Sequence, residues 1–375
     1  MSFSILQPAR IFFGRGQAAQ AAALAKGFGP RGLVVHGANP ARAAELVRAL
    51  GPDTLALPCA TEPTLPMLEQ ATAIARVHRP DWVLAIGGGA VLDLGKALAA
   101  MIPAPGAAMD HLEVVGKGLP LHADPLPFLA LPTTAGTGAE VTKNAVIGLP
   151  DHGRKVSLRD DRMIARVAVI DPALTDGCPW AVTLASGLDA VTQVIEPFVS
   201  VKANAYSDAI SLPAIAPGLR ALMRLQHGED PAARDALAWT SLCGGLALAN
   251  AGLGVVHGFS GVIGGTTGAA HGAICGALLG PVIAMNRART TGDARARLDR
   301  VCTILAEELG CATDEAPAAL SHWAHQAGLP RLSALGVAGA EHAALATAAQ
   351  SASSSKGNPV TLGHDDLCAI LAQAG

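Results

Sequence analysis

The fold class is indicated most clearly by Trp82-Val83-Leu84-Ala85-Ile86-Gly87-Gly88-Gly89-Ala90-Val91-Leu92-Asp93-Leu94-Gly95-Lys96. Its first five residues form an uninterrupted apolar run, which is typical of a strand buried on both faces. Three glycines follow, and Val91–Met101 then has helical composition. A strand, a glycine loop and a helix in this order predict the first part of a βαβ unit in a parallel sheet.

Similar signals lie on both sides of this stretch. Gly32–His36, Phe128–Leu131 and Val167–Ile170 are further short apolar runs, and Pro40–Leu50 has the composition of a helix. Apolar runs that alternate with helices favour a parallel sheet. We therefore predict an α/β N-terminal domain, with a parallel sheet, over residues 1–178.

The character of the chain changes after about Cys178. Long stretches rich in Ala and Leu, such as Ala232–Asn250 and Ala340–Ser351, contain few β-branched runs. This composition predicts an all-α C-terminal domain over residues 179–375.

The glycine loop fits neither common phosphate-binding motif. Leu92 occupies the third glycine position of G-x-G-x-x-G, and the P-loop pattern fails because Ala97 follows Lys96. Three successive glycines cost backbone entropy, and bare N–H groups at a helix start can bind a phosphate. Phosphate binding is therefore favoured, and a plain tight turn is the alternative. In the loop after Phe128–Leu131, Thr133, Thr134 and Thr137 could bind a ligand, but on their own they are better explained as a capped helix start.

Charge and cysteine content exclude several classes of protein. The chain has 27 basic and 30 acidic residues and no run of Lys or Arg, which argues against nucleic-acid binding. Its seven cysteines never form C-x-x-C, so neither a disulfide framework nor a structural zinc motif is predicted. A reducing, cytoplasmic compartment is expected. The N-terminus has no signal-peptide pattern, and the uncharged segment 251–285 is predicted to be a buried helix–loop–helix rather than a membrane span.

Four polar side chains in the second half could form a metal site. Asp189 and Gln193 are four residues apart, so on a helix they share one face. On one straight helix His257 and His271 would lie about 21 Å apart. The glycine-rich break at Gly264–Gly268 would let them converge. Aspartate and histidine suit Zn²⁺ or Fe²⁺, whereas a glutamine amide is a weak ligand. The alternative is a pair of core histidines with local hydrogen bonds.

Taken together, these motifs resemble the iron-containing alcohol dehydrogenase family, within the dehydroquinate synthase-like superfamily. The resemblance covers nearly the whole chain. Its motifs are Gly87-Gly88-Gly89-x-x-x-Asp93-x-x-Lys96, Pro132–Thr142, Asp171-Pro172, Gly187-x-Asp189-Ala190, Glu196, Val256-His257-Gly258, His271-Gly272 and Lys356-Gly357-Asn358-Pro359.

The resemblance implies a nicotinamide-binding N-terminal domain, a helical C-terminal domain that holds metal and substrate, an active site between them, and a homodimer. It implies NAD or NADP as cofactor, and Fe or Zn as metal. Because an acidic residue that would favour NAD is replaced by Gly37, NADP should also be accepted. The implied cofactor-binding residues are Gly37, Gly87, Gly88, Gly89, Asp93, Thr133, Thr134, Thr137, Asn144 and Lys155.

The implied metal ligands are Asp189, Gln193, His257 and His271, and the two histidines are the implied catalytic residues. The sequence departs from the family twice, since Gln193 replaces a histidine ligand and Gly261 replaces a second histidine. A divalent metal would then be held by three residues, with Gln193 a weak or absent fourth ligand.

The leading hypothesis is an oxidoreductase that transfers a hydride between NAD(P) and a small alcohol, aldehyde or ketone. If a metal is bound, it would stabilise the alkoxide as a Lewis acid. Without it, protonated His257 or His271 would have to donate a hydrogen bond to the alkoxide. One alternative is a metal-independent reductase of a carboxylated substrate, as in maleylacetate reductase. Another is a dinucleotide-binding protein that no longer catalyses.

Overall fold

The computed structural model describes residues 2–375, which divide into two compact units. The sheet unit contains Leu6–Thr134 and Ala139–Asp176. The helical unit contains residues 2–5, 135–138 and 177–375.

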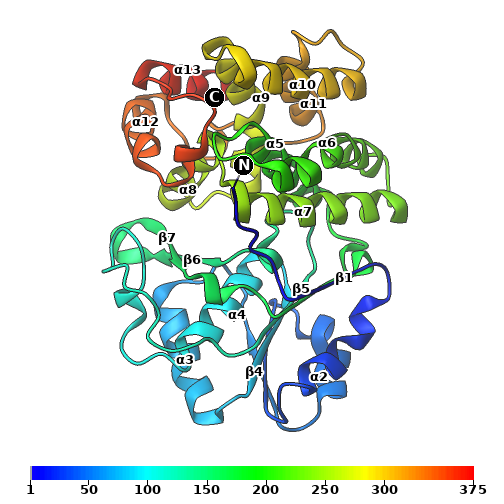
Figure 1. The fold of residues 1–375 in the computed structure, drawn as a ribbon, viewed down its shortest axis with the longest axis vertical. Helices are drawn as coiled ribbons and strands as arrows, with labels where there is room; N and C mark the ends of the chain where they lie inside the picture. Colours follow the sequence, from blue (N-terminus) through cyan, green and yellow to red (C-terminus); the bar gives the residue numbers. More distant parts are fainter. Residues whose placement is uncertain (1) are drawn as a thin grey trace. The chain divides into compact units, whose positions relative to one another are not determined.

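The sheet unit is built on a six-stranded parallel sheet (Figure 1). The four apolar runs found in the sequence are four of its strands, and the predicted α/β class with a parallel sheet is confirmed. In spatial order the strands are β1 (Arg10–Phe13), β8 (Val167–Ile170), β5 (Phe128–Pro132), β4 (Trp82–Gly87), β2 (Gly32–His36) and β3 (Thr54–Pro58).

Helices cover both faces of this sheet, because alternate residues of each buried strand point to opposite faces. From β2, Leu33 and Val35 pack in the same core as α3 (Leu65–His78) and α4 (Gly89–Met101), while Val34 lies in the core formed with α1 and α2. Helix α1 spans Ala21–Lys26, and α2 spans Ala44–Leu50. The predicted helix 40–50 is therefore a 3₁₀ turn, Pro40–Ala43, followed by α2.

An antiparallel hairpin, β6 (Asn144–Leu149) and β7 (Arg154–Arg159), was not predicted. It packs on α4, where the fully buried Lys96 joins the hairpin to the preceding loop. Its Nζ donates to the carbonyl oxygens of Ala139 and Asn144 at 2.7 and 2.9 Å, and to Thr142 Oγ1 at 3.0 Å. Burial lowers the pKa of Lys96 to about 8. Lys96 therefore holds these segments together and is not a phosphate-binding lysine.

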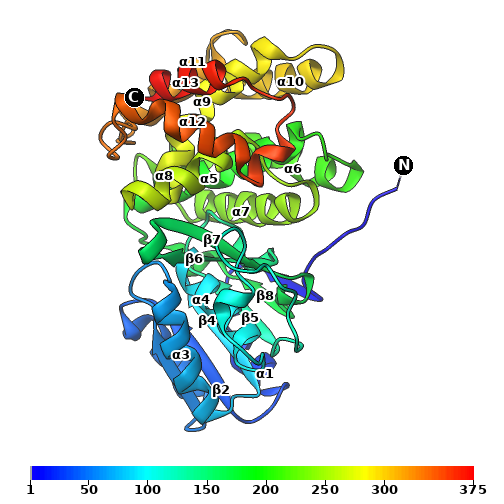
Figure 2. The ribbon, with the colours of Figure 1, turned by 90° about the vertical axis from the view of Figure 1, so that its left-hand side faces the viewer.

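The helical unit contains only helices and connecting segments among its described residues, as the sequence predicts (Figure 2). In this unit α5, α6 and α7 pack against one another, and α9 packs on α5, α8 and α11. The helices are α5 (Trp180–Val199), α6 (Ala205–Leu225), α7 (Pro231–Ala251), α8 (Val255–Thr267), α9 (His271–Arg289), α10 (Gly292–Leu309), α11 (Ala316–Gln326), α12 (His342–Ser351) and α13 (His364–Ala374).

The helix–loop–helix predicted in the uncharged segment is formed by α8 and α9. The predicted break at Gly264–Gly268 is too long, since α8 continues through Thr267. Only Gly268, at φ +71°, ends the helix in the left-handed conformation that favours glycine.

Over residues 2–375, no single helix has the length and apolar character needed to cross a membrane. The pair α7 and α8 meets these criteria only when taken together, and it is bent by 101° at the break between the two helices.

Candidate metal and cofactor sites

One edge of the sheet brings together several of the predicted cofactor residues. Chain order reverses between β2 and β4, because β3 lies on one side of β2 and the later strands of this sheet, β4, β5 and β8, lie on the other. Open α/β sheets bind ligands at the carboxyl ends of the strands at such a reversal. The register pairs His36 with Ile86 and Gly87 with Pro132, so Gly37, Gly87 and Thr133 follow at the same edge. There the Thr133 N–H donates to the Gly87 carbonyl oxygen at 2.9 Å.

Gly87 and Gly88 differ in how much room the neighbouring residues leave for a side chain. A Cβ on Gly87 would lie 2.5 Å from Val91 Cβ, so this glycine is required by the packing of the first turn of α4. A Cβ on Gly88 would meet only Thr134 within 4 Å, with Oγ1 at 3.3 Å. Gly88 has φ −74°, which any residue can adopt. Protein packing therefore explains Gly87, whereas the open side of Gly88 leaves its backbone accessible to a ligand.

Gly37, at the end of β2, has no atom within 4 Å of the position that a Cβ would take. A larger side chain would therefore fit there without displacing a neighbour. His36, before it, is buried, and its Nδ1 lies 2.7 Å from the Gly37 carbonyl oxygen.

The remaining cofactor candidates lie elsewhere. The carboxylate of Asp93 accepts a hydrogen bond from the Val146 N–H at 3.1 Å and so joins α4 to β6. Lys155, on β7, forms an ion pair with Glu62, which lies in the loop after β3. Asn144 begins β6, where its carbonyl accepts from Lys96.

Thr137 lies in the segment 135–138, which belongs to the helical unit. In that segment the Gly136 N–H donates to Ser241 Oγ of α7 at 2.8 Å. A Cβ on Gly138, at φ +59°, would overlap Gly245 Cα. The glycines beside Thr137 thus allow this loop to lie directly against α7.

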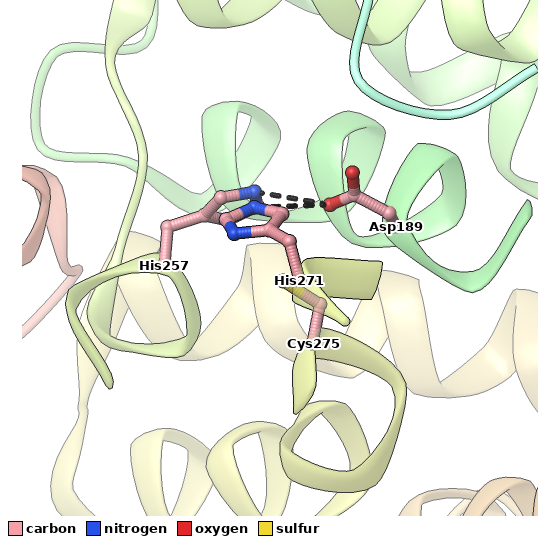
Figure 3. A group of neighbouring side chains, drawn as sticks. All are labelled: Asp189, His257, His271 and Cys275. Carbon is pink, nitrogen blue, oxygen red and sulfur yellow. Dashed lines mark ion pairs between the residues drawn. The ribbon is translucent and has the colours of Figure 1, made fainter. Parts of the chain in front are cut away.

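Three of the four predicted metal residues, Asp189, His257 and His271, lie together within the helical unit (Figure 3). Asp189 comes from the middle of α5, His257 from the first turn of α8, and His271 is the first residue of α9. The two imidazole rings have their centroids 5.4 Å apart. Asp189 Oδ1 lies 3.2 Å from His257 Nε2 and 3.8 Å from His271 Nε2. The short turn at Gly268 thus brings the two histidines to the same carboxylate.

Three buried polar atoms at this point have no hydrogen-bond partner among the described residues: Asp189 Oδ1, His257 Nε2 and Gln193 Oε1. Unpaired buried polar atoms are costly and normally have a partner. Oxygen and imidazole nitrogen are also the donor types that divalent transition metals take. The residues present therefore fit a metal ion. Gln193 lies one turn after Asp189 on α5, in the position that its sequence spacing predicts.

Glu196 orients His257, although in the sequence it stands out only as part of a family motif. Its Oε2 lies 2.6 Å from His257 Nδ1, and its Oε1 accepts from the Val256 N–H at 2.8 Å. When the only ring proton of His257 is on Nδ1, shared with Glu196, Nε2 carries a lone pair 3.2 Å from Asp189 Oδ1. Two lone pairs so close repel each other unless a cation or a proton lies between them. Metal-binding histidines commonly have such a carboxylate on the other ring nitrogen.

We expect Glu196→Gln to lower metal affinity by about 10- to 100-fold, the usual cost of losing such a supporting group. Glutamine has nearly the same shape, but it is neutral and has only one acceptor oxygen. It therefore cannot accept from both the Val256 N–H and His257 Nδ1. Competition with a coloured chelator measures the change. Because Glu196 has a positioning role, the unfolding temperature of the metal-free protein should change little, although metal affinity falls. Unchanged affinity would show that Glu196 is only a structural residue.

A fourth side chain, Cys275, completes this cluster and was not predicted. Its sulfur and one ligand atom each from Asp189, His257 and His271 all lie within 4.8 Å of one another. The sequence contains a signal that could have found it, because Cys275 follows His271 by four residues on α9. Burial alone raises the thiol pKa of Cys243 to about 12. For Cys275 burial also acts upward, but the two neighbouring imidazoles outweigh it and lower the pKa.

Burial and the neighbouring charges shift the pKa values of the cluster's side chains in opposite directions. Burial alone would raise the pKa of Asp189, but the neighbouring histidines lower it to about 2. Burial likewise disfavours a charged His271, yet the Cys275 thiolate and Asp189 raise its pKa to about 9. The His271 side chain keeps 39% of its surface exposed, whereas that of Asp189 keeps 2%. Access to the cluster from solvent is therefore on the His271 side.

At Gly261, where the sequence departs from the family, no atom lies within 4 Å of the position that a Cβ would take.

Two family profiles together match most of the chain. The profile "Iron-containing alcohol dehydrogenase" matches residues 8–172, and "Fe-containing alcohol dehydrogenase family, C-terminal" matches residues 183–375. Among solved structures, a 1,3-propanediol oxidoreductase superposes with a TM-score of 0.88 at 26% identity, covering 100% of both chains.

Curated relatives agree with these profiles. Alcohol dehydrogenase 4 of Schizosaccharomyces pombe is 32% identical over 83% of this chain and 73% of its own length. Lactaldehyde reductase of Escherichia coli is 33% identical over 81% of this chain and 80% of its own length. Long-chain-alcohol dehydrogenase 1 of Geobacillus thermodenitrificans is 39% identical, but the match spans only 56% of this chain and 53% of that relative. The chain belongs to the iron-containing alcohol dehydrogenase family.

Proposed function

We propose that this protein is an NAD(P)-dependent alcohol dehydrogenase or carbonyl reductase. It transfers a hydride between the nicotinamide and the carbinol carbon of a small alcohol, whose oxidised form is an aldehyde or ketone. The observation that carries the proposal is the buried group of Asp189 and two histidines, with polar atoms left without hydrogen-bond partners. Membership of the family implies NAD(P) and a metal. Several relatives are named for alcohols or for lactaldehyde, which supports a small alcohol or aldehyde as substrate.

In this proposal residues 1–178 form the dinucleotide-binding domain, and residues 179–375 form the metal- and substrate-binding domain. The Gly87–Gly89 loop binds the pyrophosphate through backbone N–H groups at the start of α4, where the helix dipole favours an anion. The open backbone face of Gly88 and its place at the strand-order reversal support this role. The other cofactor residues proposed from the sequence are Gly37, Asp93, Thr133, Thr134, Thr137, Asn144 and Lys155.

In the helical unit, Asp189, His257 and His271 hold the metal, and Gln193 is at most a weak ligand. When bound, the metal supplies a Lewis acid that stabilises the negative oxygen of the alkoxide. Asp189 contributes the negative charge that retains a cation in a buried place. Glu196 keeps the His257 proton on Nδ1, so that Nε2 stays available. The partly exposed His271 marks the side from which a substrate oxygen reaches the site.

The test is a comparison of metal-free and metal-loaded protein. Purified protein is stripped with a chelator, reloaded with Fe²⁺ or Zn²⁺, and assayed with a panel of short alcohols and aldehydes and both cofactors. We expect activity to disappear on stripping and to return on reloading. Full activity in the stripped protein would favour the metal-independent reductase instead. Cofactor binding without turnover of any substrate would favour a protein that no longer catalyses.

We expect Gly37→Asp to lower kcat/KM with NADP at least about tenfold relative to NAD. An aspartate at the end of β2 would accept a hydrogen bond from the ribose 2′-OH of NAD and repel the 2′-phosphate of NADP. The open space at Gly37 accommodates the new side chain. Steady-state kinetics with both cofactors measure the ratio, and Gly37→Ala is the uncharged control, which should change it little. A native enzyme that already prefers NAD by orders of magnitude would contradict this explanation.

The homodimer and the cytoplasmic location stay predictions. Sedimentation equilibrium of the purified protein tests the first of them.

A further inference from the structure

We propose that Cys275 is the fourth protein ligand of this metal, so that the donor set is Asp189, His257, His271 and Cys275 and favours Zn²⁺ over Fe²⁺. The inference rests on the metal site of the proposed function and adds a ligand to it. Thiolate sulfur is a soft donor, and mixed imidazole and thiolate sites are typical of zinc.

The first argument is placement. His271 and Cys275 lie at positions i and i+4 of α9, so their side chains occupy the same face on successive turns. Figure 3 shows both side chains coming from this helix, with Asp189 coming from another. Because α9 also packs on α5, the face that carries His271 towards Asp189 carries Cys275 as well.

The second argument is distance. A tetrahedral ion with bonds of about 2.0 Å to nitrogen and oxygen and about 2.3 Å to sulfur needs ligand atoms about 3.3 to 3.6 Å apart. The two Asp189–histidine distances are 3.2 and 3.8 Å. All four ligand atoms already lie within 4.8 Å of one another. The four ligand atoms, which come from α5, α8 and α9, therefore already lie close to the spacing that such an ion needs.

The third argument is charge. Asp189 alone leaves a divalent ion with a net charge of about +1 in a buried place, and uncompensated buried charge is costly. Gln193 cannot correct this, because its amide oxygen is neutral. A Cys275 thiolate brings the net charge of the ion and its ligands to zero. Metal binding then breaks the S–H bond, forms the metal–sulfur bond and releases the proton to solvent, as is usual for thiol ligands.

The fourth argument is burial. Cys275 is fully buried, so its sulfur is protected from solvent oxidants. Cys302 is equally buried on α10 but is not part of the cluster, which makes it a matched control.

The test uses the full-length protein loaded with Co²⁺, a spectroscopic substitute for Zn²⁺. We expect the native protein to show a near-ultraviolet sulfur-to-cobalt charge-transfer band. Cys275→Ser should lose this band and bind Zn²⁺ at least about tenfold more weakly in a chelator competition. Cys302→Ala should keep both the band and the affinity. Cys275→Ala provides a second variant if the serine protein does not fold.

A ligand exchange makes the test independent of stability. Gln193→His added to Cys275→Ser supplies an imidazole from α5 in place of the thiolate. We expect this double variant to regain metal affinity while the charge-transfer band stays absent. Metal bound with no band in the native protein, or with the same band in Cys275→Ser, would overturn the role of Cys275 but leave the proposed function intact. Failure of the native protein to bind any divalent metal would overturn both.

Discussion

Replacing Asp189 by asparagine should release the metal and lower kcat/KM for alcohol oxidation by roughly 10³-fold. A Lewis acid at a developing alkoxide contributes several kcal/mol, and about 4 kcal/mol corresponds to this factor. Asparagine has nearly the same volume, so the packing of α5 is preserved, but its neutral amide removes the charge that holds the cation. Metal content of the purified variant and steady-state kinetics at saturating cofactor measure the two effects.

The matched control for this substitution is Asp208→Asn. Asp208 is a partly exposed carboxylate on α6 that pairs with Arg297 in the same unit, and exposed ion pairs contribute little to stability. Its loss should leave both metal content and kcat/KM nearly unchanged. If Asp189→Asn keeps the metal at native affinity, the ligand assignment is wrong, and another group must stabilise the alkoxide.

The sequence was sufficient for the central strands of the fold because they are buried on both faces. Val83, Leu84 and Ala85 have no exposed surface, so no polar residue interrupts their run. The edge strands β1 and β3 were missed for the opposite reason. Their residues are only partly buried, and a short, half-exposed run does not stand out from a loop.

The candidate site was predictable where it depends on one helix. Asp189 and Gln193 share a face of α5 by spacing alone. Bringing together His257 and His271 required tertiary structure, since the sequence left open whether the two histidines meet. In the sequence Cys275 is one of seven scattered cysteines, although its spacing from His271 follows the same helical rule. Pairing every cysteine with a histidine four residues before it would have reduced the seven cysteines to two, Cys275 and Cys368.

The glycine loop shows how packing and ligand binding can share one motif. The sequence treats the three glycines alike, but a Cβ on Gly87 would lie 2.5 Å from Val91 Cβ, whereas a Cβ on Gly88 would meet only Thr134, at 3.3 Å. The distinction depends on the structure, because Val91 in the first turn of α4 fills the space beside Gly87, whereas Thr134 is the only neighbour of a Cβ on Gly88. Of the two, Gly88 is therefore the position where a substitution tests function rather than folding.

Replacing Gly88 by valine should abolish binding of NAD and NADP while the protein remains folded. The backbone at Gly88 has φ −74° and ψ −177°, an extended conformation that valine adopts readily. The new side chain would occupy the space through which a pyrophosphate reaches the N–H groups at the start of α4. Gly88→Ala should give an intermediate loss of affinity, because its Cβ meets only Thr134 at 3.3 Å. Calorimetric titration measures cofactor affinity.

The cobalt spectrum of the same Gly88 variants is an internal control for folding. Every proposed metal ligand lies in the helical unit, whereas Gly88 lies in the sheet unit, so the charge-transfer band should not change. Native cofactor affinity in Gly88→Val would show that the loop is a plain turn and that the phosphate binds elsewhere. Loss of the cobalt band together with cofactor affinity would instead indicate general misfolding, and Gly88→Ala would then be the variant that separates the two explanations.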